Sequence, residues 1–116
     1  GAVAALRHQL GGGCGVPHGE ASTIVLPHVM RWNGAAAEVS LSRAATHLGL
    51  ADTEALIGRV VEVTGQLGLP GRLRDVGVTD DQLDSIAHHA AAEAAARQNV
   101  RPADAAGLRA ILNAAF

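Results

Sequence analysis

Apolar residues return every three or four positions along most of the chain, and clusters of glycine or proline separate these stretches. This spacing places apolar side chains on one face of a helix, and no segment alternates long enough to indicate a strand. We therefore expect an all-α bundle of about six helices. The expected helices, with one short helical turn among them, cover residues 2–10, 18–32, 36–48, 53–67, 72–76, 80–98 and 105–115.

Glycine and proline mark the expected ends of the first two helices. The glycines between residues 11 and 15 should end the first helix, because glycine adopts left-handed or tight conformations without steric cost. Pro17 suits the first turn of the second helix, where its missing N–H would have no partner in any case. Pro27 lies inside that helix and removes one backbone hydrogen bond, so we expect a kink there.

Three later helices carry sequence signals for their start. Asp52 and Asp104 can cap the fourth and the last helix, and Thr79 to Gln82 has the form of a capping box.

The apolar residues expected to face inward are Leu56, Val60, Val63 and Leu67 on the fourth helix, and Leu83, Ile86, Ala87, Ala90 and Ala94 on the fifth.

The composition agrees with a helical protein and excludes several classes of function. A length of 116 residues suits a single domain, 1–116, and Trp32 and Phe116 are the only Phe, Trp or Tyr side chains. The net charge of −2, without a basic stripe, argues against nucleic acid or an anionic membrane as partner. Cys14 is the only cysteine, which we expect to act as a small residue in the glycine loop. A single cysteine and the lack of a bilayer-spanning apolar run indicate a cytoplasmic protein.

The candidate chemistry lies between residues 8 and 33. Three histidines, His8, His18 and His28, stand ten residues apart around the glycine run and a Pro-His-Gly turn. Imidazole titrates near neutrality, so it can move protons or bind a metal. The glycine run does not follow a strand and lacks the spacing of a dinucleotide-binding loop, so we expect no NAD(P) phosphate to bind there.

This segment resembles the C-terminal helical domain of the iron-containing alcohol dehydrogenases, a bundle also typical of dehydroquinate synthase-like proteins. The resemblance is carried by PHGEASTIVLPHVMRWN at residues 17–33, LGLPGRLRDVGV at 67–78 and NVRP at 99–102. LRHQLGG at residues 6–12 is more similar to maleylacetate reductases than to the alcohol dehydrogenases. The resemblance implies a parent reaction that transfers a hydride between NAD(P) and a carbonyl or carbon–carbon double bond near a carboxylate.

The resemblance also implies a divalent metal, Fe or Zn, held by four ligands. An aspartate and a histidine come from an earlier helix, and two further histidines stand fourteen residues apart. The second of that pair corresponds to His18, and the first corresponds to Ala4, which has no donor atom. His18 is thus a remnant of the metal site, and a catalytic ion usually needs three protein ligands. We therefore expect neither metal nor NAD(P) on the isolated chain.

The resemblance gives His8 and His18 catalytic roles, with His8 near the reacting carbon, where it would orient substrate or move a proton. Simpler interpretations stay open, because His18 can merely bond the glycine loop and His8 can pack in the core or at an interface. His28 corresponds to a position that is more structural than catalytic. Glu20 and Arg31 are candidates for binding an acidic substrate, unless they belong only to a solvated helix face.

Three functions follow. The chain is the helical, metal-side domain of a maleylacetate-reductase-like dehydrogenase, truncated relative to the family and inactive alone. Alternatively, it is a free-standing domain that binds a small molecule or catalyses a non-redox reaction without metal or NAD, which Ala4 favours. The third function is one half of a split dehydrogenase.

In the family, the first helix and the Pro-His-Gly helix line a cleft against the cofactor domain. We therefore expect an uncovered apolar surface. Its candidate residues are Leu6, Leu10, Val16 and Val25. Such a surface predicts a homodimer, or a second chain that supplies the missing domain, with His8 and His18 beside the contact or beside a pocket for a small-molecule substrate.

Overall fold

The computed structural model describes residues 1–116 and contains α-helices and short 3-10 helices without any strand, which confirms the all-α fold. No helix is both long and apolar enough to cross a membrane. The α-helices are α1 (Ala2–Cys14), α2 (His18–Asn33), α3 (Glu38–His47), α4 (Thr53–Gln66), α5 (Leu83–Ala92), α6 (Ala94–Arg97) and α7 (Ala105–Ala115). The 3-10 helices are η1 (Gly34–Ala37), η2 (Leu73–Val76) and η3 (Asp80–Gln82).

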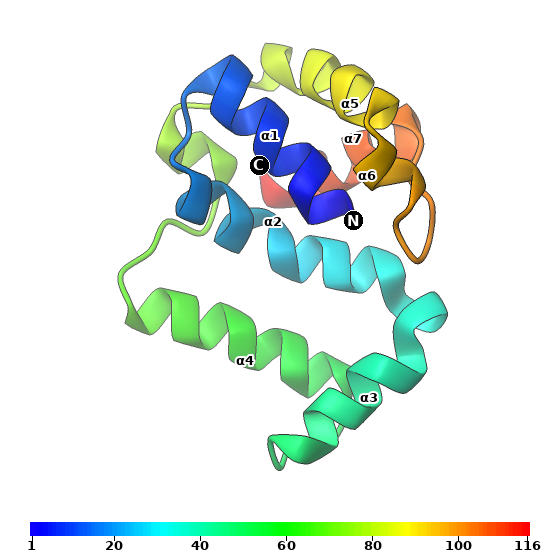
Figure 1. Ribbon diagram of the computed structural model, residues 1–116. Coiled ribbons are helices and arrows are strands. Elements are labelled where there is room, and N and C mark those ends of the chain that lie inside the picture. Colours follow the sequence, from blue (N-terminus) through cyan, green and yellow to red (C-terminus); the bar gives the residue numbers. More distant parts are fainter.

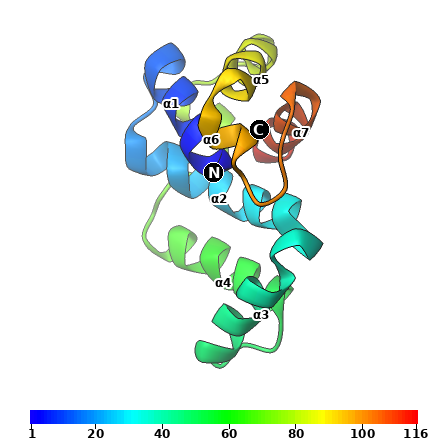
Figure 2. The same cartoon turned by 45° about the vertical axis from the view of Figure 1, so that its right-hand side comes forward.

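Helix α2 lies between two groups of helices (Figures 1 and 2). Helices α1, α5, α6 and α7 pack on one side of it and share the main core of 21 buried residues. The hairpin of α3 and α4 packs on the other side over a small core. That core consists of Met30, Ala45, Leu56 and Ile57. Most apolar burial therefore lies on the side of α2 that faces α1 and α7.

Helix α1 does not end at the glycine run, as the sequence suggested, but continues through it to Cys14. The left-handed residue is Gly15, with φ 69°, and its N–H donates to the carbonyl of Gly11 at 3.1 Å. The N–H of Val16 donates to the carbonyl of Leu10 at 3.1 Å, so α1 ends at a left-handed glycine, and the N–H groups that follow the helix satisfy carbonyls of its last turn. Three helical glycines cost stability, about 1 kcal/mol each relative to alanine, but buried neighbours on α1 offset that cost.

The expectation of an uncovered apolar surface on α1 and α2 is wrong. The four candidate side chains are all buried, at 0–3% exposure, because α5 and α7 cover them. They are Leu6, Leu10, Val16 and Val25. The large apolar side chains that do remain exposed lie mostly on α3 and α4 and just after each of them, Val39, Leu48 and Leu67 being the most open.

The inward face expected for α4 is only half correct. Leu56 is buried and Val60 is partly buried, as expected. Val63 and Leu67, in contrast, are 39% and 69% exposed, and Ile57 is the second buried residue of α4. The second half of α4 lies across a pocket from residues 23–31 of α2 rather than in a packed core with them. Burial therefore stops where the two helices no longer touch.

The long helix expected to run to about residue 98 is broken at Glu93. Its backbone is extended there, with φ −75° and ψ 141°, and α6 restarts for a single turn. Ala94 consequently is exposed, contrary to the expectation that it faces inward, and Ala96 is buried instead. Neither proline nor glycine marks this break. The side chain of Glu93 reaches α1, so a contact with another helix accompanies it.

The expected caps are present. The carboxylates of Asp52 and Asp104 each accept a hydrogen bond at 2.8 Å from the backbone N–H three residues on. The capping box of Thr79 and Gln82 is formed, although it opens η3 ahead of α5. The expected helix over 36–48 likewise begins as η1 and becomes α3 only at Glu38.

Candidate functional site

His8 projects from α1 and is held by Glu93 at the break between α5 and α6. Its Nδ1 donates to Oε2 of Glu93 at 2.9 Å, and Nε2 of Gln9 donates to the other carboxylate oxygen at 2.7 Å. The His8 side chain is 53% exposed, whereas that of Glu93 is 23% exposed. His8 is therefore neither a core residue nor a free surface residue. It is a solvent-facing imidazole whose Nδ1 is fixed by a carboxylate and whose Nε2 has no partner in the chain.

The electrostatics of this cluster favour an ionised carboxylate. Burial by itself would raise the pKa of Glu93, but the hydrogen bonds from His8 and Gln9 and the nearby imidazole charge outweigh it, so the pKa is lowered. A charged carboxylate beside Nδ1 keeps the proton on that nitrogen. Nε2 is then the acceptor that faces outward.

His18 lies at the first position of α2 and is exposed. Its backbone carbonyl accepts from the Ser22 hydroxyl at 3.0 Å, and its imidazole makes no hydrogen bond. Neither a hydrogen bond nor an ion pair joins His18 to His8, and the side chain of His18 does not bond the glycine loop.

The residues of this chain do not fit a complete metal site. Ala4 lies half-buried on α1 and offers no donor, and His18 is a single exposed imidazole. No group of three or more His, Cys, Asp or Glu side chains lies close enough together to hold an ion. Cys14, at the end of α1, is half-buried, and burial raises its pKa, which disfavours the thiolate that a metal would need.

The two residues expected to bind an acidic substrate lie far apart. Glu20 and Arg31 are both on α2, but their separation of eleven residues corresponds to about 16 Å along the helix axis. Arg31 instead pairs with Glu54 of α4, Nε to Oε1, at 3.5 Å. Glu20 makes no side-chain hydrogen bond or ion pair within the chain.

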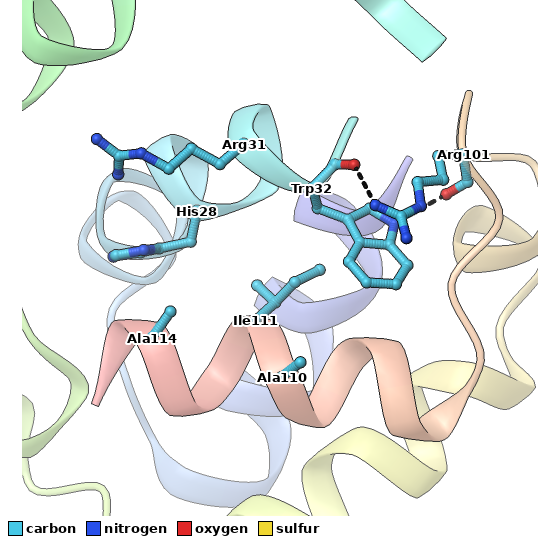
Figure 3. A pocket seen from close by; sticks show the side chains of 7 residues that line it. All are labelled: His28, Arg31, Trp32, Arg101, Ala110, Ile111 and Ala114. Atoms are coloured by element: carbon cyan, nitrogen blue, oxygen red, sulfur yellow. Dashed lines mark hydrogen bonds between the residues drawn. The ribbon is translucent and has the colours of Figure 1, made fainter. Parts of the chain in front are cut away.

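A pocket of about 280 Å³ lies between the second half of α2 and α7 (Figure 3). His28 and Arg31 stand at one end of it, and Arg101 stands at the other, over the ring of Trp32. Burial, and then the positive charge of Arg31, lower the pKa of His28, so its imidazole is neutral near pH 7. His28, expected to be structural, thus lines a pocket.

Trp32 and Arg101 hold each other by three contacts. The indole N–H donates to the carbonyl of Arg101 at 3.1 Å, and Nη1 of Arg101 donates to the carbonyl of Trp32 at 3.0 Å. The guanidinium carbon lies 3.7 Å from the ring centroid, a cation–π geometry. Asn99 also fixes Arg101 relative to the end of α2, since its amide nitrogen donates to Oδ1 of Asn33 and to the carbonyl of Arg101.

Sequence reasoning missed Glu93 and Arg101, and the signals for both were weak. Glu93 stood inside an alanine-rich stretch with the appearance of a continuous helix. Arg101 lies in the NVRP linker, which contributed to the family resemblance but indicated no contact. Each acts through a residue at least 69 positions away, and no short-range pattern reports such a contact.

Comparison with known proteins agrees with this geometry. The sequence model for the family described as Fe-containing alcohol dehydrogenase, C-terminal, matches residues 1–116. The chain is 32% identical to 1,3-propanediol dehydrogenase of Klebsiella pneumoniae over 124 residues, which covers 100% of this chain and 32% of that protein. It is 30% identical to maleylacetate reductase of Burkholderia cepacia over 111 residues, which covers 96% of this chain and 30% of that protein.

Solved structures show the same similarity. The crystal structure of a 1,3-propanediol oxidoreductase matches all of this chain with a TM-score of 0.91 at 32% identity, over 32% of its own length. That of maleylacetate reductase from Rhizobium sp. matches all of it with a TM-score of 0.83 at 28% identity, over 31% of its length. The chain spans about a third of the length of these relatives. It belongs to the Fe-containing alcohol dehydrogenase family, whose C-terminal helical domain it matches from end to end.

Proposed function

We propose that this chain is the helical domain of an NAD(P)-dependent dehydrogenase or reductase of its family, inactive on its own. The observation that carries the proposal is the family match along all 116 residues, together with relatives about three times as long. Those relatives include enzymes named maleylacetate reductase and lactaldehyde reductase. The remaining part of the enzyme, in one chain or as the other half of a split enzyme, would bind NAD(P), which supplies or takes the hydride.

His8 is the residue we propose for proton movement. Glu93 holds the proton on Nδ1, so Nε2 is available to accept or return a proton at a substrate oxygen, and half of the side chain is open to a ligand. His18, at the start of α2, would line the cleft that the family resemblance implies between this domain and the cofactor domain. The proposal assigns no step to a metal, because Ala4 and His18 do not form an ion site.

A chimera tests this proposal. Residues 1–116 would replace the matching C-terminal third of Klebsiella 1,3-propanediol dehydrogenase, with and without Ala4→His, and NAD-dependent oxidation of 1,3-propanediol would be measured. We expect activity in the Ala4→His chimera and a loss of about 10²-fold or more in kcat when His8 is changed to Gln. The exposed Gln66→Ala is the matched control. A folded, NAD-binding chimera whose activity does not depend on His8 would contradict the proposed role.

Two measurements test the expected inactivity of the isolated chain. Calorimetric titration with NAD and NADP should detect no binding, since no glycine-rich loop follows a strand. Elemental analysis of protein purified without chelator should find no stoichiometric iron or zinc. Micromolar cofactor binding, or one metal per chain that is lost in His18→Ala, would contradict the proposal.

Ala4 favours a second candidate function, a repurposed domain that binds a small molecule or catalyses a non-redox reaction without metal or NAD. In that case a ligand of the isolated chain would act at His8 and His18. A small-molecule screen followed by NMR of the histidine resonances separates the two proposals, because the domain of a larger dehydrogenase should show no such ligand.

The partner and the location remain proposals. We propose a homodimer or a second polypeptide that completes the cofactor site, and light scattering on the purified chain checks the first. The buried positions of Leu6 and Leu10 move the contact away from the apolar face of α1. A single half-buried cysteine supports the cytoplasm as the location.

A further inference from the structure

A second pocket adjoins the one between α2 and α7. It lies between α2, α4 and the segment before η2, has a volume of about 320 Å³, and shares His28, Arg31 and Ala114 with the first pocket. Two hollows that meet at the same three residues form one continuous surface along α2. We call this surface the α2 groove.

Positive charge gathers in the α2 groove although the protein carries a net charge of −2. Arg31 and Arg101 line the first pocket, Arg31 and Arg72 line the second, and neither is lined by an Asp or Glu. Arg72 makes no ion pair in the chain. The pair of Arg31 with Glu54 joins two exposed side chains, Nε to Oε1 at 3.5 Å, so it is weak.

The imidazole of His28 sits where the two pockets meet. Burial and the charge of Arg31 both lower the pKa of His28, and no carboxylate side chain lines either pocket. A neutral imidazole can still donate one hydrogen bond to a ligand oxygen. Each pocket therefore combines two arginines with the same neutral donor.

The rest of the groove is apolar. Ala110, Ile111 and Ala114 of α7 form one wall of the first pocket, and Figure 3 shows them opposite His28 and Arg31. Ile24 and Val61 line the second pocket. Arg31 and Arg101 stand toward opposite ends of the first pocket, so a ligand between them would contact apolar side chains in its middle.

We propose that the α2 groove binds a small organic anion, a carboxylate or phosphate ester carried on an apolar group. Guanidinium groups bind both oxyanions through charge-assisted hydrogen bonds. The alanine and isoleucine wall accepts the apolar part, and pockets of this volume suit a ligand at the small end of the usual range. The site does not involve His8 or His18, so it stands independently of the proposed dehydrogenase role.

NMR titration of the 116-residue chain tests the site with four probes: benzoate, phenyl phosphate, inorganic phosphate and the neutral analogue benzamide. We expect saturable shifts with benzoate or phenyl phosphate at residues that line the two pockets, 23–32, 61–72, 101 and 110–114, and the tighter binding of the two probes identifies the oxyanion. The double variant Arg31→Gln/Arg72→Gln should bind at least about tenfold more weakly, since it removes the arginine that both pockets share and the other arginine of the second pocket. Both side chains are exposed, so the variant should fold.

The exposed Arg43→Gln on α3 is the matched control and should leave binding unchanged. Bound anion should also move the titration of His28 to higher pH, because it offsets the charge of Arg31 that now lowers the pKa. Benzamide or inorganic phosphate binding as tightly as the best organic anion, or an unaffected double variant, would overturn the proposal. So would shifts that do not saturate.

Discussion

The indole of Trp32, at the end of α2, lies directly against the backbone of Gly107 in the first turn of α7. A Cβ on residue 107 would stand 2.6 Å from Cη2 of the indole and 2.8 Å from Cζ2. Real Cβ atoms do not approach so closely, and contacts with Arg101 hold the indole in place. Gly107 is therefore the residue that lets the two helices meet at one wall of the α2 groove.

Gly107→Ala should destabilise the protein by about 1–3 kcal/mol, because the added methyl group has to displace an indole that Arg101 holds in place. Urea denaturation measures the free energy of unfolding. The control is Gly58→Ala, where nothing lies within 4 Å of the added Cβ, and it should stabilise α4 by about 0.5–1 kcal/mol. Equal effects of the two substitutions would show that the indole is free to move.

Asn99→Ala should cost about 1–3 kcal/mol, because it leaves buried groups without partners. The side chain of Asn99 is only 8% exposed, accepts from the N–H of Ala2 at 3.0 Å, and donates to Asn33 and to the carbonyl of Arg101. It thus ties the start of α1 to the end of α2. Thermal unfolding measures the loss. Asn113→Ala, exposed on α7, is the control, and a loss there as large as at Asn99 would contradict this account.

Gly15→Ala and Gly13→Ala should change stability in opposite directions. Gly15 has φ 69°, so alanine there would be strained by roughly 1–2 kcal/mol. Gly13 is helical with open space around it, so alanine should stabilise α1 by about 0.5–1 kcal/mol. Chemical denaturation of both variants decides. A stabilising Gly15→Ala would show that α1 ends elsewhere.

The contacts of Glu93 with His8 and Gln9 should make the free energy of unfolding depend on pH in the acidic range. The pKa of Glu93 is lower in the folded protein than its ordinary value of 4.5, so its stabilising contribution is complete above that value. The contribution is lost as the pH falls through the lowered folded pKa. Glu93→Gln should therefore flatten the decline of stability below about pH 4.5, and Gln9→Ala should flatten it less, because His8 still donates to the carboxylate. Unfolding free energies at several acidic pH values provide the measurement, and an unchanged slope in Glu93→Gln would refute the assignment.

Local signals in the sequence were sufficient for the fold class and for most helices. The capping residues Asp52 and Asp104 act where the sequence placed them, since a cap depends only on the next three residues. The motif PHGEASTIVLPHVMRWN also identified the family correctly. These features depend on neighbours along the chain, so the chain alone determines them.

Tertiary contacts decided the remaining features. Glycine propensity predicted that the first helix would end at residue 10, but packing of the helix carries α1 to Cys14. The chain breaks its helix at Glu93, whose side chain bonds His8, 85 positions away. Trp32 and Arg101, which contact each other, are 69 positions apart. Burial of Leu6 and Leu10 likewise depends on which helices cover α1. Side-chain contacts across such separations form only when helices pack, so no periodicity or propensity in the sequence encodes them locally.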